Sequence, residues 1–247
     1  MSKDKIRIDR LLVDLGLVES RNKAHALIMA GLVLVEDKRV EKPSEAYTRD
    51  SRIQIKNHPS LTKYVSRGGI KLEKALRDFN IMPNGYVCLD IGASTGGFTD
   101  CLLQHGAAKV IAIDVGRNQF AWKLRIDKRV ELREGVNARY LSPSGFKERF
   151  DLITIDVSFI SLKKIIPAAL PLLNEKGRII ALIKPQFEVG RKDVDKGGLV
   201  KDEHKLKRVV EDINSFVESL GLKVCRTIES PITGAKGNRE FLSLYSF

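Results

Sequence analysis

Hydrophobic and polar positions alternate in two different ways along the chain, and the change falls near residues 56–67. Before it, apolar residues at helical spacing predict two short helices, within 7–17 and 21–31, and each run stops at a glycine. Alternating residues predict a hairpin at 32–40 and a further strand at 51–56. A proline and several polar residues then interrupt the periodicity. We therefore expect a small α+β unit, followed by a boundary.

Apolar runs with polar flanks recur after the boundary, with helical stretches between or beside them. The runs lie at 85–92, 108–116, 150–159 and 177–188, and the helical stretches include 97–106 and 162–173. This alternation predicts a parallel sheet covered on both faces. The last two runs, 222–230 and 239–247, leave no room for a crossover helix and should pair antiparallel. The pattern predicts a Rossmann-like α/β fold of the class I methyltransferase type, with a mostly parallel seven-stranded sheet and a C-terminal antiparallel hairpin.

Composition and net charge limit the kinds of binding partner and the cell compartment that we expect for this chain. The 247 residues carry 43 Lys+Arg against 31 Asp+Glu, a net charge of +12. This excess suits a polyanion, although net charge also serves solubility. The charged opening "MSKDKIRIDR" and the lack of a long apolar run predict neither a secretion signal nor a membrane span. Three cysteines without metal-ligand spacing predict a reducing cytoplasm and no metal site.

The loop "LDIGASTGGFTD", at 89–100, follows a predicted strand and precedes a predicted helix. Two phosphate-binding motifs nearly fit it. A Walker A loop needs a lysine where this chain has Phe98, so nucleoside triphosphate hydrolysis is not expected. The dinucleotide fingerprint needs a middle glycine where this chain has Ser94.

A ligand with an amino-acid head and a nucleoside tail suits this loop better. The Asp90 carboxylate can bind an ammonium group of the ligand or order the loop. The glycines allow a ligand to approach the loop backbone closely. Asp114 ends the next strand and can accept both ribose hydroxyls. S-adenosylmethionine has these parts and no phosphate; a structural glycine turn with Asp114 as a helix cap is the alternative. The expected cofactor-binding residues are Asp90, Gly92, Ser94, Thr95, Gly96, Gly97, Phe98, Asp114, Val115 and Asn137.

The sequence motifs after the parallel strands indicate which chemical group accepts the methyl. The fourth parallel strand lacks the Pro-Pro pair typical of amino-group methyltransferases, and Cys88 and Cys101 lie in a strand and a helix, not in a loop that attacks a base carbon. A ribose hydroxyl must be oriented and lose its proton, which lysines beside carboxylates can bring about. Four such residues stand where elements meet the C-terminal edge of the sheet: Lys71, Asp156, Lys184 and Glu240. Each one alone could equally be a surface ion-pair member.

The segments "RIDRLL", "GLVESRNKAHALIMAGLVLV" and "KPSEAY" resemble the S-four-like RNA-binding domain over residues 1–58. The resemblance implies that four basic residues face RNA: Arg7, Arg10, Arg21 and Lys23. An amphipathic helical pair whose charges are merely solvated is the alternative.

Lys71, Asp156, Lys184 and Glu240 match the K-D-K-E tetrad of the FtsJ-like ribose methyltransferases. With "YVSRGGIKLEKAL", "DIGASTGGFTD", "DVSFISL", "KPQFE" and "NREFL", the whole chain resembles the TlyA, or hemolysin A, family. The resemblance implies 2′-O-methylation of cytidine in ribosomal RNA, with S-adenosylmethionine as cofactor. It also implies that Lys63, Tyr64 and Arg67 help to couple RNA binding to cofactor binding.

The expected organisation is an RNA-binding domain at 1–60, a linker at 61–66 and a methyltransferase domain at 67–247, in a cytoplasmic, monomeric protein that meets ribosomal subunits. Our hypothesis for the chemistry is that Lys184 contacts the 2′-hydroxyl as base. Repulsion from Lys71 would favour its neutral amine, and the carboxylates would orient both lysines.

Three other functions compete with this hypothesis. An RNA-binding protein with a non-catalytic methyltransferase fold would be favoured by a missing tetrad member. A cytolysin would need a secretion signal, a membrane-inserting segment or a long glycine-rich strand pair. A pseudouridine synthase would need an Arg-Leu-Asp catalytic strand, and "RIDRLL" is helical in pattern.

Overall fold

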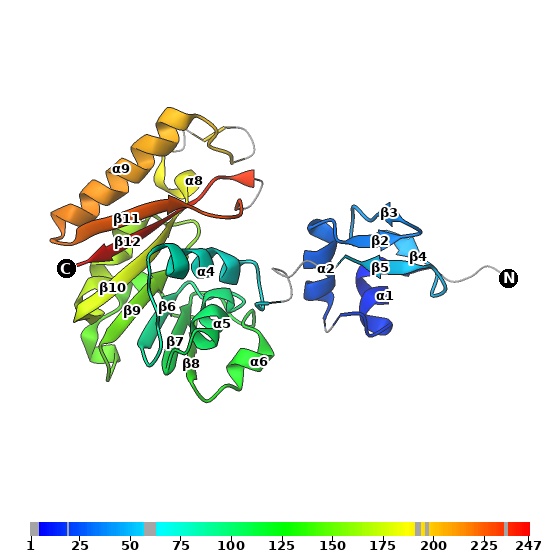
Figure 1. The fold of residues 1–247 in the computed structure, drawn as a ribbon, viewed down its shortest axis with the longest axis horizontal. Helices are drawn as coiled ribbons and strands as arrows, with labels where there is room; N and C mark the ends of the chain where they lie inside the picture. Colours follow the sequence, from blue (N-terminus) through cyan, green and yellow to red (C-terminus); the bar gives the residue numbers. More distant parts are fainter. Residues whose placement is uncertain (1–4, 19, 57–62, 191–193, 196–197, 235–236) are drawn as a thin grey trace. The chain divides into compact units, whose positions relative to one another are not determined.

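The structure is a computed structural model that describes residues 5–18, 20–56, 63–190, 194–195, 198–234 and 237–247. The chain divides into two compact units, Met1–Lys63 and Tyr64–Phe247 (Figure 1). The sequence placed 61–66 in a linker, but the larger unit already begins at Tyr64. The side chain of Tyr64 is buried in the hydrophobic core of that unit, so the C-terminal half of the expected linker belongs to the fold.

The smaller unit packs two helices against short strands. Its elements are β1 Ile6–Arg7, α1 Ile8–Asp14, α2 Arg21–Met29, β2 Val33–Val35, β3 Lys38–Arg39, β4 Ala46–Tyr47 and β5 Ile53–Ile55. Strand β2 pairs antiparallel with β3 and β5, and β1 pairs antiparallel with β4. The Ser20 side chain caps α2 by accepting from the backbone N–H of Lys23. The two helices, the hairpin and the further strand expected from the sequence are all present.

The larger unit is built on a seven-stranded sheet in the order β11-β12-β10-β9-β6-β7-β8. Its strands are β6 Val87–Ile91, β7 Lys109–Asp114, β8 Val130–Glu134, β9 Phe150–Ile155, β10 Leu173–Ile183, β11 Lys223–Glu229 and β12 Phe241–Ser246. Strands β10, β9, β6, β7 and β8 run parallel, and β12 lies antiparallel between β10 and β11. The expected mostly parallel sheet with a C-terminal antiparallel hairpin is confirmed.

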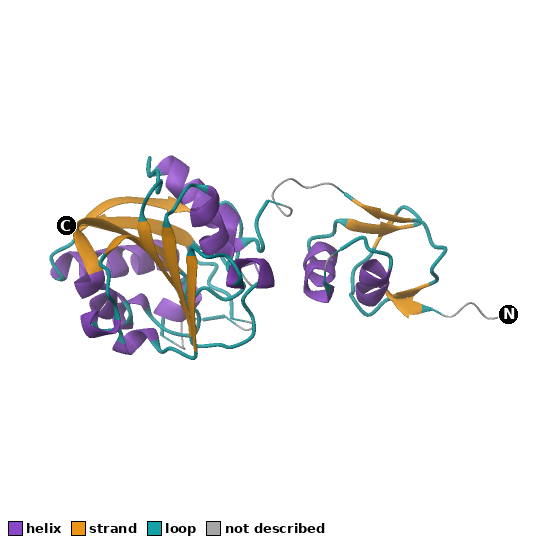
Figure 2. Ribbon diagram, turned by 90° about the horizontal axis from the view of Figure 1, so that it is seen from below, coloured by secondary structure: helices purple, strands orange, loops and turns teal. Residues whose placement is uncertain are grey.

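Helices cover both faces of the sheet (Figure 2). Successive strand residues alternate between two separate cores; on β6, Cys88 faces one and Leu89 the other. The first core also takes side chains from α4 Gly68–Asp78 and α5 Gly97–Gln104. The second takes them from α9 Glu203–Ser219. The strands are rich in Val, Ile and Leu because both of their faces are buried.

Three segments differ from the pattern-based expectations. The helix expected over 162–173 is broken into the 3-10 turns Leu162–Lys164 and Leu170–Leu172 around α7 Ile166–Ala169, because Pro167 and Pro171 cannot donate backbone hydrogen bonds. Strand β8 was not identified, since its five residues are all only partly buried. The C-terminal part of the run at 177–188 forms the short helix α8 Pro185–Glu188.

A further short α-helix of the larger unit lies between two strands of the sheet. Helix α6 Trp122–Arg125 follows β7 and leads into β8.

Packing of α9 on the sheet should contribute strongly to stability. Ile213, on the inner face of α9, is fully buried, so Ile213→Ala removes buried methyl groups and leaves a cavity. We expect the free energy of unfolding to fall by about 2–5 kcal/mol in urea denaturation. Lys207→Ala, on the exposed face of the same helix, should change it by less than about 0.5 kcal/mol. Equal effects of the two substitutions would contradict this packing.

Candidate functional site

A cavity of about 400 Å³ opens where five segments of the larger unit meet, at the C-terminal edge of the parallel strands. The segments are the chain entering α4, the glycine loop after β6, the loops after β9 and β10, and the residues that precede β12. Its lining residues are Ser66, Arg67, Gly68, Lys71, Gly92, Ala93, Ser94, Thr95, Gly97, Phe98, Asp156, Ser158, Phe159, Lys184, Gln186, Phe187, Thr233, Gly234 and Glu240. A cavity of this size can take a small-molecule ligand.

The four residues predicted as a catalytic tetrad all line this cavity, as two ion pairs. The Lys71 ammonium contacts Glu240, which is 169 residues away in sequence. The Lys184 Nζ lies 2.6 Å from Asp156 Oδ1 and donates to Ser158 Oγ at 2.8 Å. The side chain of Asp156 is 20% exposed, and the other three are 3–11% exposed. Each lysine therefore has its own carboxylate in a largely water-excluded wall.

The chain closes tightly over Glu240. A Cβ atom on Gly234 would lie 1.9 Å from Glu240 Oε1, so only glycine lets this segment approach the carboxylate. One residue earlier, the Thr233 carbonyl accepts a hydrogen bond of 2.9 Å from Arg67 Nη2. Arg67, predicted to couple RNA and cofactor binding, thus lines the cavity and holds the segment that covers the Lys71–Glu240 pair.

The glycine loop lies against other backbone at two points. Gly92 has φ +86°, and a Cβ there would lie 2.4 Å from the Asp156 carbonyl oxygen. A Cβ on Gly97 would lie 2.2 Å from Ser66 Oγ and 2.9 Å from the Gly69 nitrogen. The loop can therefore sit beside the loop after β9 and the start of α4 only because these residues have no side chain.

The ten residues predicted to bind a cofactor divide into two groups. Gly92, Ser94, Thr95, Gly97 and Phe98 line the cavity. The others lie outside this lining: Asp90, Gly96, Asp114, Val115 and Asn137.

In the second group, Gly96 belongs to the loop itself, and the other residues support the loop or stand apart from it. Asp114 accepts hydrogen bonds from the backbone N–H of Ser94 at 2.7 Å and of Gly116 at 2.6 Å, so its carboxylate fixes the glycine loop to the end of β7. Val115 is exposed, and Asn137 caps the 3-10 turn Ala138–Tyr140.

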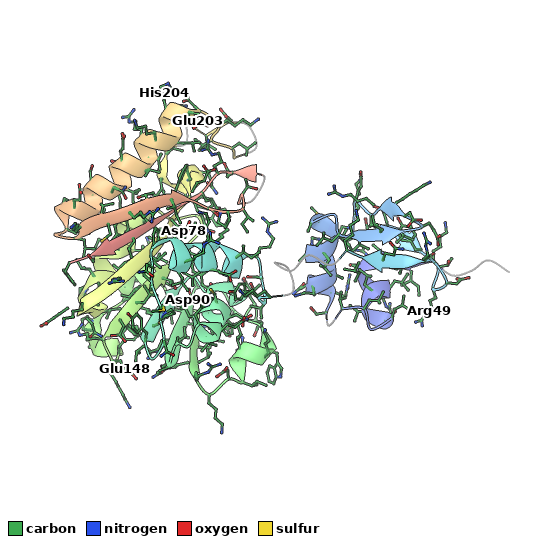
Figure 3. All side chains as sticks on the ribbon, in the orientation of Figure 1. Arg49, Asp78, Asp90, Glu148, Glu203 and His204 are labelled. Carbon is green, nitrogen blue, oxygen red and sulfur yellow. The ribbon has the colours of Figure 1, made fainter. Side chains whose placement is uncertain are left out.

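Asp90 lies within the larger unit, fully buried on β6 (Figure 3). Its carboxyl accepts from Thr99 Oγ1 at 2.7 Å and from Thr154 Oγ1 at 3.0 Å. Burial raises the pKa of Asp90 to about 6, against the lowering effect of the two hydroxyls. The sequence left open whether Asp90 meets a ligand or orders the loop; the structure shows it tying β6 to the first turn of α5 and to β9.

The three arginines predicted to face RNA in the smaller unit are exposed, yet each contacts a carboxylate. Arg7 and Arg21 both contact the buried Asp9, at 3.1 and 2.7 Å. The pKa of Asp9 is lowered to about 2, chiefly because the Arg7 side chain donates hydrogen bonds to its carboxylate. Arg10 pairs with Asp14 at 3.6 Å.

Three further predicted RNA-contact residues differ in exposure. Lys23 is partly exposed and Lys63 is exposed, while Tyr64 is 2% exposed. The Tyr64 ring lies where a Cβ on Gly69 would meet it at 2.3 Å, so it packs on the start of α4. In this structure Tyr64 supports the helix that carries Lys71 and has no surface to offer RNA.

Sequence reasoning missed several cavity residues that lie two or three positions after tetrad members. Phe159 comes three residues after Asp156, is 91% exposed, and has φ +62°, which is strained for a bulky side chain. Its ring centroid lies 4.9 Å from that of Phe187. The Oε1 atom of Gln186 is buried in the wall with no hydrogen-bond partner among the described residues. Their positions beside Asp156 and Lys184 in "DVSF" and "KPQF" were the available signal.

Within the described part of the chain, no cluster of three His, Cys, Asp or Glu side chains could hold a metal ion. Among the same residues, no helix has the length and apolarity needed to cross a membrane.

Comparison with known proteins gives matches across the chain. A family model described as FtsJ-like methyltransferase matches residues 64–247, and one described as S4 domain matches residues 6–53. The 16S/23S rRNA (cytidine-2′-O)-methyltransferase TlyA of Mycobacterium tuberculosis is 42% identical over 96% of this chain and 88% of its own length. Hemolysin A of Brachyspira hyodysenteriae is 44% identical over 96% and 98%. A solved structure of a candidate hemolysin from Streptococcus thermophilus has a TM-score of 0.78 and 43% identity, and covers 99% of this chain and 89% of that one.

The raised pKa of Asp90 predicts pH-dependent stability. Because it lies above the ordinary 3.8, the folded chain binds more protons than the unfolded chain between pH values of about 4 and about 6. The Asp90 contribution to the free energy of unfolding should therefore fall as the pH rises through this window, by up to about 3 kcal/mol. Urea unfolding should show Asp90→Asn gaining stability relative to the wild type over the same window. The exposed Glu175→Gln provides the control, and a flat difference for Asp90→Asn would contradict the prediction.

Proposed function

Because the chain belongs to the FtsJ-like methyltransferase family and carries an S4 domain, we propose that it transfers a methyl group from S-adenosylmethionine to a cytidine 2′-hydroxyl of ribosomal RNA in the cytoplasm. The observation that carries this proposal is that both lysine–carboxylate pairs and the glycine loop line one cavity. A TlyA relative at 42% identity is named as a 16S/23S rRNA (cytidine-2′-O)-methyltransferase, which supports the same class of substrate here.

The residues of the cavity fit such a cofactor. Gly92 and Gly97 leave bare backbone where a Cβ would collide with neighbouring atoms, and the Gln186 Oε1 atom is a buried acceptor that lacks a partner among the described residues. S-adenosylmethionine would supply an electrophilic methyl group on a cationic sulfonium. The chain would hold it through the backbone at 92–97 and the Gln186 amide, with Asp114 acting indirectly through the N–H of Ser94.

The lysine–carboxylate pairs would prepare the hydroxyl. Lys184 can accept the 2′-hydroxyl proton when its amine is neutral, and Asp156, 2.6 Å away, then stabilises the ammonium that forms. Ser158 Oγ fixes the direction of the same amine. The Lys71 ammonium is held by Glu240. Its remaining N–H donors can orient the ribose, so its role is not limited to repelling the Lys184 ammonium.

The RNA would first be held by the smaller unit. Its exposed arginines, Arg7 and Arg21, both contact Asp9. This shared contact brings their two guanidinium groups together at the surface. Such a fork suits phosphate oxygens. RNA binding by this unit explains how a small cavity could act on a very large substrate.

Loss of the Lys184 amine should stop the reaction. We expect Lys184→Met to lower the rate of methyl transfer to ribosomal subunits by about 10²–10⁴-fold, because the hydroxyl loses its proton acceptor. Transfer is measured with isotopically labelled S-adenosylmethionine and separate ribosomal subunits, followed by mapping of the modified nucleotide. Lys176→Met, exposed near the other end of β10, is the matched control. Full transfer by Lys184→Met would refute the assigned role, and no transfer by the wild type would refute the proposed function.

The proposed cofactor-binding site can be tested by a binding measurement that does not depend on catalysis. Gly92→Ala would place a methyl group 2.4 Å from the Asp156 carbonyl oxygen at φ +86°, so the loop must shift. We expect S-adenosylmethionine binding, measured by calorimetry, to weaken by at least about tenfold, with a loss of stability of about 1–3 kcal/mol. Gly145→Ala, where a Cβ would meet nothing within 4 Å, should leave both unchanged. Unaltered cofactor binding by Gly92→Ala would show that the ligand lies elsewhere.

A further inference from the structure

The surface of helix α6 carries a feature that the proposed chemistry does not use. Trp122 is the only tryptophan of the chain, and it is 72% exposed. One helical turn later Ile126 is 62% exposed, and its N–H donates to the Trp122 carbonyl. Two large apolar side chains are thus exposed one turn apart, at the first residue of α6 and at the residue that ends it. Such adjacent exposure has a solvation cost that burial against a partner would remove.

The surrounding charge indicates what kind of partner would cover this surface. Residues 117–129 contain five basic residues and one acidic residue. Three of the basic side chains are neutralised: Lys123 by Asp100, Arg125 by Glu134 and Arg129 by Asp127. The other two are Arg117 and Lys128, both exposed. No ion pair of Lys128 is found among the described residues, and Arg117, after Arg125, helps to lower the pKa of Glu134. Along the chain, Arg117 precedes Trp122 and Lys128 follows Ile126, so the two apolar residues stand between two cationic positions.

The underside of the same helix supports the glycine loop. A Cβ on Gly96 would lie 2.5 Å from Leu124 Cδ1 and 3.0 Å from Phe120 Cε2, so both buried side chains press on the loop backbone. The Ala121 N–H donates to the Thr95 carbonyl at 3.2 Å. A partner bound on the outer face of α6 would therefore bear on the segment that carries Thr95 and Gly96.

We propose that Trp122 and Ile126, with Arg117 and Lys128, form a second RNA-contact surface, on which an unpaired nucleobase stacks on the indole while the two cations meet its flanking phosphates. This inference rests on the proposed function, and it adds a contact on the methyltransferase unit itself. Aromatic side chains bind bases of any sequence by stacking, and cations in the same groove follow the phosphate backbone. RNA bound at this surface stabilises the glycine loop through Phe120 and Leu124.

The single tryptophan allows a direct test on the full-length protein. Titration with protein-free 16S or 23S ribosomal RNA should quench the Trp122 fluorescence, and added salt should weaken the quenching because phosphates are involved. Trp122→Ala should bind the same RNA about tenfold more weakly in filter binding, and Trp122→Phe should retain most of the affinity. Lys128→Glu should weaken binding and reduce its dependence on salt. The control is Met82→Ala, 78% exposed before β6 and therefore near the opposite, N-terminal edge of the parallel strands.

Each outcome bears on the inference. Unchanged RNA affinity in Trp122→Ala and Lys128→Glu would overturn it, as would a loss seen with intact subunits but not with protein-free RNA, which would indicate a ribosomal protein as the partner. Weaker binding of S-adenosylmethionine by Trp122→Ala in the absence of RNA would place Trp122 in the cofactor site instead. If the wild type transfers no methyl group but RNA still quenches Trp122, the proposed function fails while the contact surface stands.

Discussion

The larger unit depends on one constraint: a charge buried in the wall of a cavity must be paired. Lys71 and Glu240 meet from positions 169 residues apart, and neither is more than 10% exposed. Removal of one partner of such a pair leaves an uncompensated buried charge, which costs about 3–5 kcal/mol. The contact therefore holds the start of α4 to the residues before β12. The same requirement brings Lys184 to Asp156, at the ends of two adjacent parallel strands.

The glycine loop is tied into the same framework from several sides. Asp90 holds α5 and β9 beneath it, Asp114 holds its backbone to β7, and α6 supports it through Leu124. The N–H of Val65 donates to Asp100 on α5, so the chain that enters α4 is fixed to the helix after the loop. The binding surface and the lysine–carboxylate pairs are thus parts of one connected structure, and a ligand on the loop would lie directly beside them.

Much of the fold followed from patterns that act locally. Strands buried on both faces show long apolar runs, and helix ends carry their own chemistry, as at Ser20 and Gly31. Where the local signal was weak or mixed, prediction failed. Strand β8 is only partly buried and alternates charge with apolar residues, and Pro167 and Pro171 break a segment whose composition is typical of a helix. The larger unit begins at Tyr64, three residues before the domain start expected from the sequence, because burial of Tyr64 depends on contacts with α4 that the sequence around it does not reveal.

The sequence by itself determined the class of the fold and the place of the glycine loop, and it predicted the four residues of the tetrad, because each follows from residue types at particular ends of predicted elements. Only the tertiary structure decided which lysine pairs with which carboxylate, that Asp90 and Asp114 support the loop from outside the cavity lining, and that Phe159, Gln186 and Gly234 belong to the wall. It also showed Trp122 to be exposed. Pairing, burial and exposure arise from contacts between residues far apart in the chain, and these are fixed only when the sheet and its helices have assembled.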